Sequence, residues 1–287
     1  MSLRAIEFFS GLGGWRYSLG ELGQVAKAFD ISTLANATYA LNHGDHPSTR
    51  ELATLGAEEI EAVKAGLWLL SPPCQPFCRM GNHQDLADPR SRAFLNLMEI
   101  LDKHPPAALA LENVEGFLRS QAHGKLTGLL QKHGFHWQEH TLCPTRFGVP
   151  NQRPRVYILA STRPLRDRQP PQLDPRPLGS YLDPAEDESL LLPEAVIQKH
   201  GPGLAIVSAE DRRSACFIGG YGRRWVGSGP FLRTAHGVRR FSPAEIGRLL
   251  GLPDSFHFPS ELSLEHRYKL LGNSLSLPVA RWVLEGL

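Results

Sequence analysis

A cysteine on a short proline-rich loop is the residue of this sequence best suited to chemistry. Cys74 lies within Ser71-Pro72-Pro73-Cys74-Gln75-Pro76-Phe77, directly after the apolar run Leu67–Leu70. The prolines stop the preceding strand and stiffen the loop, and a thiolate held there can act as a nucleophile. A buried cysteine is also common as inert packing, so the role of Cys74 depends on which side chains the fold brings to it.

Three further reactive side chains stand directly after one apolar run or at the start of another. Glu112 follows the run Ala107–Leu111, while Arg153 and Arg155 lead into the run Arg155–Ala160. In open α/β sheets, ligands bind beyond the carboxyl ends of the strands. We therefore expect a thiol, a carboxyl group and guanidinium groups to converge above one sheet. A surface or sheet-end ion pair is the alternative role for each arginine.

The elements that must position these side chains alternate along the first 160 residues. Short apolar runs are separated there by helical patterns, which is typical of a parallel sheet covered by helices. The predicted strands are Ala5–Phe9, Val25–Phe29, Leu67–Leu70, Ala107–Leu111 and Arg155–Ala160. Prolines gather after Thr162, and the Gly- and Arg-rich region to about Gly237 shows little periodicity. Ser242 and Glu245 form a capping-box pattern that predicts a helix start, and Leu277–Leu284 predicts a last helix that packs on the sheet.

A glycine-rich loop follows the first predicted strand, at the start of a helix. Its sequence, Phe9-Ser10-Gly11-Leu12-Gly13-Gly14, allows a ligand to approach the backbone closely. Arg16 stands where a dinucleotide motif requires its last glycine, and a phosphate-binding lysine motif is absent, so NAD and ATP are disfavoured. Asp30, at the end of the second strand, is placed to accept hydrogen bonds from ribose hydroxyls. The pattern favours an adenosine cofactor without a pyrophosphate, such as S-adenosylmethionine (AdoMet); a plain turn with Asp30 as a helix cap is the alternative.

Composition and charge exclude several classes of protein. The 287 residues are 41% hydrophobic and 21% charged, which is ordinary for a globular chain and argues against wholesale disorder. No apolar run approaches the roughly 20 residues that span a bilayer, and the first residues lack a secretory signal, so a cytoplasmic location without membrane contact is expected. Four cysteines are too few for a disulfide scaffold, and only Cys74 and Cys78 lie close together, so no metal site is predicted.

The net charge of +2 is too small to identify a nucleic-acid-binding protein, but the distribution of charge is informative. Between Arg212 and Arg240 there are seven arginines and no Asp or Glu, interleaved with aromatic residues and glycines. Arginine next to aromatic rings suits phosphate contact and base stacking; a solvated basic face is the alternative. The candidate nucleic-acid-binding residues are Tyr221, Arg223, Arg224, Trp225, Arg239 and Arg240.

Several motifs, in this order, make the chain resemble the cytosine-C5 methyltransferase family. They are the glycine loop, Pro-Pro-Cys-Gln at residues 72–75, Glu-Asn-Val at 112–114, the Asn-x-Arg-x-Arg run at 151–155 and Leu-Gly-Asn-Ser at 271–274. Within this superfamily the chain is most similar to the tRNA (cytosine-38-C5) methyltransferases, a branch grouped with the DNA enzymes as type 2. The stretches that carry this similarity are Pro72–Phe77 with Asp88-Pro89-Arg90, Cys143–Leu159, Cys216-Phe217-Ile218 with the following Gly-Gly-Tyr-Gly, and His266–Leu275.

Three positions differ from the family patterns. Asn151 stands where the DNA enzymes usually carry glutamine, which favours the tRNA branch. Ile218 replaces the threonine of that branch's Cys-Phe-Thr motif, so the hydroxyl group is lost, and Cys78 stands where relatives often carry a hydroxyl residue. The last two departures concern the RNA preference more than the chemistry.

The resemblance implies covalent catalysis. Cys74 would add to C6 of cytosine, which makes C5 able to attack the methyl group of AdoMet, with S-adenosylhomocysteine as the product. Glu112 would hydrogen-bond N3 and the exocyclic amine, Arg155 would hold O2, and Arg153 with Arg155 would favour the thiolate. The implied cofactor-binding residues are Phe9, Ser10, Gly11, Gly13, Gly14, Asp30, Ile31, Glu51, Pro73, Asn273 and Ser274.

We therefore predict a Rossmann-like α/β fold of the AdoMet-dependent methyltransferases, with helices on both faces of the sheet and a small inserted target-recognition region. Residues 1–161 would form the AdoMet-binding catalytic domain and 162–237 the target-recognition region. Residues 238–287 would supply the C-terminal helices that complete the catalytic domain.

The predicted function is cytosine-C5 methylation in a tRNA anticodon loop, by a monomer with no protein partner implied. The short middle region fits a folded RNA better than a major-groove sequence, and an unpaired loop releases a base at lower cost than a duplex. A DNA methyltransferase of a modification system and an inactive homologue that binds AdoMet and nucleic acid remain the alternatives.

Overall fold

The computed structural model describes residues 2–75, 85–185 and 187–287, which fold into two compact units. The first unit comprises Met1–Leu142, Pro154–Gln169 and Ala280–Leu287, and the second comprises Cys143–Arg153 and Pro170–Val279. The chain therefore passes from the first unit to the second twice and ends in the first. None of the helices in these described ranges is long and apolar enough to cross a membrane.

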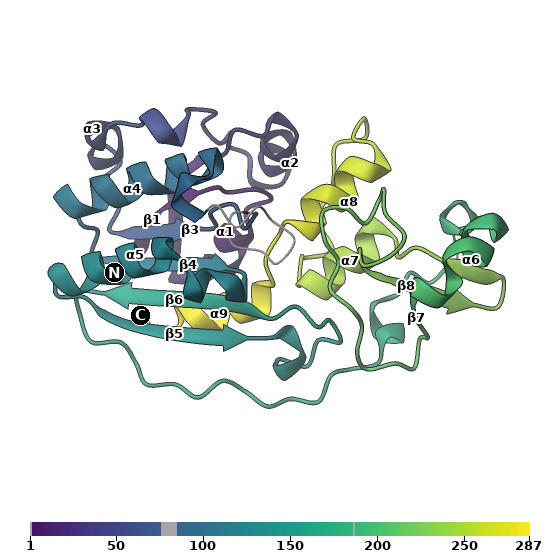
Figure 1. Ribbon diagram of the computed structural model, residues 1–287. Coiled ribbons are helices and arrows are strands. Elements are labelled where there is room, and N and C mark those ends of the chain that lie inside the picture. The colour runs from purple at the N-terminus through teal and green to yellow at the C-terminus, as the bar shows by residue number, and fades with distance from the viewer. Residues whose placement is uncertain (1, 76–84, 186) are drawn as a thin grey trace. The chain divides into compact units, whose positions relative to one another are not determined.

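A mixed six-stranded sheet forms the centre of the first unit (Figure 1), with the strand order β2-β1-β3-β4-β6-β5. The strands are β1 (Leu3–Phe8), β2 (Gly23–Phe29), β3 (Leu67–Leu70), β4 (Ala108–Asn113), β5 (His136–Leu142) and β6 (Arg155–Ser161). The first four in chain order run parallel, whereas β6 is antiparallel to both of its neighbours. Every residue of β3 is buried, which explains its continuous apolar sequence, because both faces of a central parallel strand are covered.

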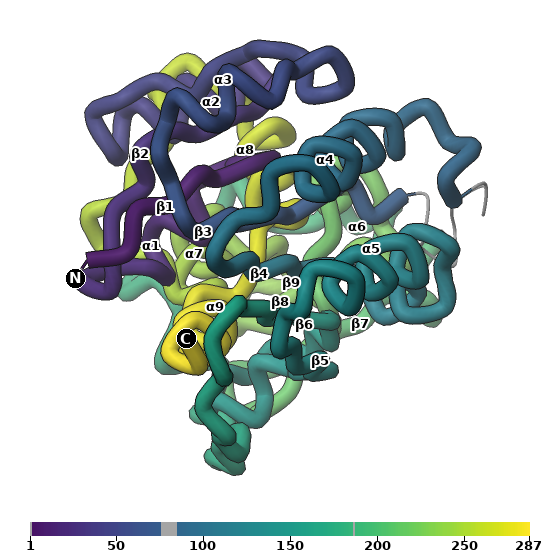
Figure 2. Tube along the Cα trace, turned by 90° about the vertical axis from the view of Figure 1, so that its left-hand side faces the viewer, coloured from purple at the N-terminus to yellow at the C-terminus, as the bar shows by residue number. Residues whose placement is uncertain are grey.

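Helices cover both faces of this sheet, as the tube trace in Figure 2 shows. They are α1 (Gly14–Leu19), α2 (Thr33–His43), α3 (Ala57–Glu61), α4 (Arg92–Lys103), α5 (Gln121–Lys132) and the part of α9 (Leu277–Leu284) from residue 280. On one face, Leu97 of α4 and Leu126 of α5 belong to the same buried core as Ile158 of β6. On the opposite face, Trp15 of α1 packs edge-on against Tyr157 of β6, with ring centroids 6.3 Å apart. The predicted fold class is confirmed.

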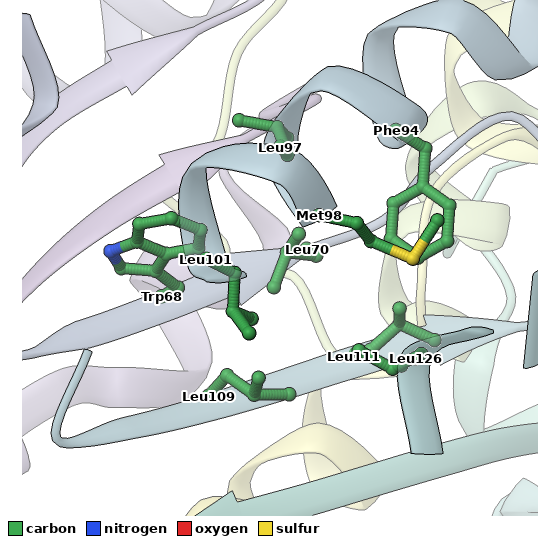
Figure 3. Close-up of a pocket in the computed structure, with 9 residues that line it drawn as sticks. All are labelled: Trp68, Leu70, Phe94, Leu97, Met98, Leu101, Leu109, Leu111 and Leu126. Carbon is green, nitrogen blue, oxygen red and sulfur yellow. The ribbon is translucent and has the colours of Figure 1, made fainter. Parts of the chain in front are cut away.

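A small apolar pocket lies between α4 and the sheet (Figure 3). Its lining residues are Trp68, Leu70, Phe94, Leu97, Met98, Leu101, Leu109, Leu111 and Leu126. All of them are buried members of one hydrophobic core. A polar ligand would lose its hydration there without compensating hydrogen bonds, so this pocket is part of the packed core and no candidate for a cofactor or a nucleic acid.

The second unit contains a small sheet with the order β7-β8-β9. Its strands and helices are β7 (Ala205–Val207), β8 (Pro230–Thr234), β9 (Gly237–Arg239), α6 (Glu194–His200), α7 (Pro243–Leu250), α8 (Leu264–Gly272) and the first turn of α9. The capping box predicted at the start of α7 is confirmed. The side chain of Ser242 accepts the backbone N–H of Glu245 at 3.1 Å, and the Glu245 carboxylate accepts the N–H of Ser242 at 2.7 Å.

The compact units divide the chain differently from the predicted functional segments. Residues 143–153 and 238–279 pack with the second unit. In the first of these segments, the backbone N–H of Gln152 donates to the carbonyl of Ser214 at 2.9 Å, which joins it to the middle of the chain. The division into functional domains stays a prediction. Of the predicted C-terminal segment 238–287, only the residues from Ala280 pack with the unit that holds the large sheet.

Candidate active site

The glycine loop joins the end of β1 to the start of α1 through left-handed backbone conformations. Gly13 has a φ of 79°, and a side chain there would place Cβ only 2.3 Å from Nε2 of His43. At Gly11, φ is 53° and a Cβ would meet none of the described heavy atoms within 4 Å. Phe9, half-buried, also has a positive φ of 57°, and Gly14 begins α1. Gly11 therefore leaves open space beside the backbone, as the close approach of a ligand requires.

Asp30 holds this loop in place from the end of β2. Its Oδ2 accepts the N–H of Gly11 at 2.8 Å, and its Oδ1 accepts the N–H of Ser32 at 2.8 Å. Burial raises the pKa of Asp30, while these two bonds act in the opposite direction. The cap of α2 is Ser32, whose side chain accepts the N–H of Ala35 at 3.3 Å. Asp30 therefore serves the glycine loop, and each carboxylate oxygen keeps a lone pair for a ribose hydroxyl.

Three other predicted cofactor-binding residues, Ser10, Ile31 and Glu51, differ in exposure. Ser10 is 5% exposed, and its Oγ has no hydrogen-bond partner among the described residues. Ile31 is 64% exposed. Glu51 is exposed and caps the following turn by accepting the N–H of Ala53 at 3.3 Å. A buried hydroxyl without a partner requires an explanation, and beside an open glycine and an exposed apolar side chain it fits an adenosine-containing ligand with a polar group.

Glu7 is a buried carboxyl group next to the loop that the sequence patterns did not single out. It is 0% exposed in β1, and its Oε1 accepts the N–H groups of Trp15 at 3.0 Å and Arg16 at 3.3 Å. The hydroxyl of Tyr39 donates to Oε2 at 3.2 Å. Burial raises the pKa of Glu7 to about 8, although these hydrogen bonds lower it. The available signal was a single acidic residue inside an apolar strand, because such a residue requires buried partners.

Cys74 and the preceding Pro73 are half-buried on the loop that follows β3. Asn113, at the end of β4, is 1% exposed; its Nδ2 donates to the carbonyl of Pro72 at 3.1 Å, and its Oδ1 accepts a backbone N–H at 2.8 Å. This side chain fastens the cysteine loop to the strand that carries Glu112. The later part of the predicted motif, Pro76, Phe77 and the departure at Cys78, lies outside the described residues.

A second set of bonds holds the residue after the cysteine. Nη1 of Arg90 donates to Oε1 of Gln75 at 2.6 Å. The same guanidinium donates to both carboxylate oxygens of Asp88, at 2.8 and 2.6 Å. The Asp88-Pro89-Arg90 motif thus has a structural explanation, since it fixes the neighbour of Cys74.

Glu112 and Arg155 meet at the carboxyl ends of β3 and β4, where the cysteine loop begins. Oε1 of Glu112 lies 3.3 Å from Nε of Arg155, and the two side chains are 11% and 16% exposed. Antiparallel pairing of Asn113 with Val156 brings the end of β4 next to the start of β6. Leu70, the last residue of β3, pairs with the residue before Glu112. The structure thus brings the loop that carries Cys74 to the end of β4, where Glu112 pairs with Arg155.

Arg153, Asn273 and Ser274 belong to the second unit. Arg153 is 4% exposed. Its Nη1 donates to the carbonyls of Phe217 and Gly272, at 3.2 and 3.3 Å, and to Sγ of Cys216 at 3.3 Å. Its Nη2 donates to the carbonyl of Ser274. These bonds hold the segment that carries Asn273 and Ser274. The roles of these three residues beside a thiolate or a cofactor stay predictions.

The structure corrects the prediction of nucleic-acid binding at Tyr221 and Arg239. Tyr221 is 0% exposed; its hydroxyl donates to the carbonyl of Pro230 at 2.7 Å and accepts the N–H of Phe241 at 3.0 Å. Arg239 is 3% exposed, and its guanidinium binds both carboxylate oxygens of Glu245 at 2.7 and 2.8 Å. Neither side chain is available to a base or a phosphate, because both serve the core of the second unit.

The other four candidates of the basic stretch remain accessible to different degrees. Arg223 and Arg224 are exposed, and Arg223 forms a surface ion pair with Glu265 at 3.2 Å. Trp225 is half-buried, and the guanidinium of Arg240 lies 4.0 Å from the centre of its ring. Burial lowers the pKa of Arg240. These residues therefore offer two exposed cations and one cation–π pair.

The fold and the candidate site together define an α/β methyltransferase. Residues 3–189 and 196–287 match the family described as C-5 cytosine-specific DNA methylase, and the chain belongs to this family. The enzyme class expected from the motifs is thereby confirmed.

Individual relatives match along almost the whole chain. The tRNA (cytosine(38)-C(5))-methyltransferase of Schizosaccharomyces pombe is 32% identical, covering 98% of this chain and 96% of the relative. The DNA (cytosine-5)-methyltransferase of Dictyostelium discoideum is 29% identical, covering 99% and 93%. Among solved structures, the Entamoeba histolytica methyltransferase EhMeth superposes with a TM-score of 0.94 at 28% identity, covering 99% of this chain and 97% of that one.

Proposed function

We propose that this chain methylates C5 of a cytosine in a tRNA anticodon loop, at the position equivalent to 38, with AdoMet as the methyl donor. The observation that carries this proposal is the arrangement of the Cys74 loop, Glu112 and Arg155 at the carboxyl ends of β3 and β4. Similarity to the S. pombe tRNA enzyme over nearly the full length supports the choice of substrate.

The residues that would hold AdoMet lie in the segments after β1, β2, α2 and β3 and in the C-terminal part of the chain. They are Phe9, Ser10, Gly11, Gly13, Gly14, Asp30, Ile31, Glu51, Pro73, Asn273 and Ser274. The cofactor supplies a methyl group activated by its bond to a positively charged sulfur. Asp30 would orient the ribose hydroxyls, Ser10 would donate its otherwise unused hydroxyl, and Ile31 would cover the adenine ring.

Cys74 would drive the reaction through a transient bond to the base. Its thiolate adds to C6 of cytosine, which breaks the aromaticity and makes C5 nucleophilic. C5 then takes up the methyl group, the proton at C5 passes to water, and the C6–S bond breaks to return the thiolate. The complete cycle returns Cys74 to its starting thiolate, as covalent catalysis requires.

Glu112 and Arg155 would stabilise the base while charge develops on it. The Glu112 carboxyl group would hydrogen-bond N3 and the exocyclic amine, and Arg155 would hold O2. Their separation of 3.3 Å allows one ring to engage both side chains, since O2 and N3 are neighbours on cytosine. A role of the Glu112–Arg155 pair in binding the base, next to the Cys74 loop, would explain why both side chains are largely buried.

The anticodon loop is favoured over duplex DNA for an energetic reason. The target base must leave its stack, and this costs less in an unpaired loop than in a duplex. The basic surface formed by Arg223, Arg224 and the Trp225–Arg240 pair suits phosphates and an unstacked base. The name of the Dictyostelium relative makes a DNA cytosine-C5 methyltransferase the second candidate.

The substrate is tested by incubating the protein with labelled AdoMet and either total tRNA or genomic DNA. We expect label in tRNA, concentrated at one anticodon-loop cytosine. Label in duplex DNA alone would reject the tRNA proposal in favour of the second candidate. Label in neither nucleic acid, with AdoMet still bound, would indicate an inactive homologue.

Replacing Arg223 and Arg224 together by alanine is expected to weaken tRNA binding about 10-fold at low salt. The loss of two phosphate contacts should also reduce the slope of log affinity against log salt by about 2. Filter binding across a salt series measures both quantities. A matched control replaces Arg163 and Arg166, which are exposed residues of the first unit outside the basic stretch; equal effects of both pairs would indicate a solvated basic face.

A further inference from the structure

Trp15 connects two loops that the reaction has to align. It is the second residue of α1, it is 1% exposed, and its backbone N–H donates to Oε1 of the buried Glu7 carboxyl group at 3.0 Å. This bond anchors the start of α1, directly after the glycine loop. The position of the Trp15 side chain is therefore set by the same groups that set the glycine loop.

The indole ring of Trp15 reaches the loop of the nucleophile. Its Nε1–H donates to Oγ of Ser71 at 2.9 Å and also to the carbonyl oxygen of Leu70 at 3.3 Å. Ser71 opens the segment that leads to Cys74, three residues later. The ring also packs edge-on against Tyr157, with an interplanar angle of 85°, and Tyr157 pairs with Glu112 across the β4–β6 ladder.

We propose that Trp15 is a positioning residue, which couples helix α1, at the end of the glycine loop, to the cysteine loop through its bond to Ser71. This inference rests on the proposed function, because it concerns the alignment of the methyl donor with the attacked base. A misplacement of about 1 Å between reacting groups can cost roughly 100-fold in rate, so a direct bond between the two loops has a functional consequence.

The test separates the hydrogen bond from the bulk of the ring. Trp15→Phe keeps an aromatic ring against Tyr157 but removes the indole N–H. Ser71→Ala removes the nearer of its two acceptors and leaves the carbonyl of Leu70 in place. We expect each variant to lower kcat about 10-fold, with the dissociation constant of AdoMet within about twofold of the wild type. The double variant should be no slower than Trp15→Phe alone, because Trp15→Phe has already removed the bond to Ser71. Additive effects would overturn the proposal and leave Trp15 as packing.

Trp68→Phe is the matched control. Trp68 is as deeply buried as Trp15, at 2% exposure, but it lines the apolar pocket on the opposite face of the sheet (Figure 3). This variant loses the same ring volume without touching Ser71. It should retain kcat within about twofold, and a loss equal to that of Trp15→Phe would show that ring volume alone decides the rate.

A second measurement needs no methyl transfer. In the cofactor-free protein, the rate at which iodoacetamide alkylates Cys74 is followed by peptide mapping, with Cys143 of the second unit as the internal reference. Loosening the loop in Trp15→Phe or Ser71→Ala should raise the Cys74 rate at least about threefold and leave the Cys143 rate unchanged. An unchanged Cys74 rate in both variants would overturn the proposal. Failure of the wild type to methylate any nucleic acid would instead overturn the proposed function and leave this readout intact.

Discussion

Replacement of Cys74 by alanine is expected to lower the rate of methyl transfer by about 10⁴-fold or more, while the affinity for AdoMet stays within about twofold. Without Sγ no bond to C6 can form, and C5 remains a poor nucleophile within an aromatic ring. The glycine loop and Asp30 are carried by β1 and β2, so the change leaves their hydrogen bonds in place. Single-turnover transfer of a labelled methyl group measures the rate, and calorimetric titration measures the affinity.

Cys143→Ala is the control for a general effect of removing a thiol, since Cys143 is also half-buried but lies in the second unit. RNA that carries 5-fluorocytosine gives a direct test of the bond to carbon. Fluorine cannot leave C5 as a proton does, so the adduct should accumulate with the wild type and be absent with Cys74→Ala. Activity of Cys74→Ala within about 100-fold of the wild type would remove the covalent mechanism.

The second large effect is expected for Glu112→Gln, which should lower kcat by about 10²- to 10³-fold. Glutamine keeps the size of the side chain and its hydrogen-bonding capacity, but it cannot share a proton with N3 of cytosine. The affinity for AdoMet should be unchanged, because Glu112 lies at the end of β4, beside Arg155. Steady-state kinetics with tRNA give kcat, and thermal unfolding shows whether the loss of the ion pair disturbs the fold.

Glu115→Gln provides the same change of charge three residues further along, at an exposed position. It should retain kcat within about twofold. If Glu112→Gln also remains within about threefold of the wild type, Glu112 only pairs with Arg155 and has no role in proton sharing. If activity falls only as far as the folded fraction falls, the same conclusion holds.

The central strands and the reactive residues at their ends could be predicted because the sequence patterns that indicate them are local. The run Leu67–Leu70 coincides with β3, since a strand covered on both faces must be apolar throughout. Strand β5, His136–Leu142, was missed because it lies at the edge of the sheet, where most of its side chains are partly or fully exposed. The strands β7 and β9 contain only three residues each, too few for a periodic pattern.

The nucleic-acid surface was predicted less well, because spacing alone cannot separate a buried aromatic residue from an exposed one. Tyr221 packs against Phe217 and Tyr268, with ring centroids 5.1 and 5.0 Å apart, and is therefore part of an aromatic core. Arg239 finds its partner in Glu245, just beyond the stretch that contains no acidic residue. The role of Glu7 was missed for a related reason, since its partners Trp15 and Tyr39 become neighbours only in the folded chain.

The reversed direction of β6 has a consequence for how Arg155 is held next to Glu112. The chain leaves the first unit at Leu142 and returns at Pro154, and Leu142 pairs with Arg155 across the β5–β6 ladder. The β5–β6 ladder thus holds the two ends of this segment next to each other. Arg155 therefore keeps its place beside Glu112 at the start of β6, although the residues just before it, 143–153, pack with the second unit.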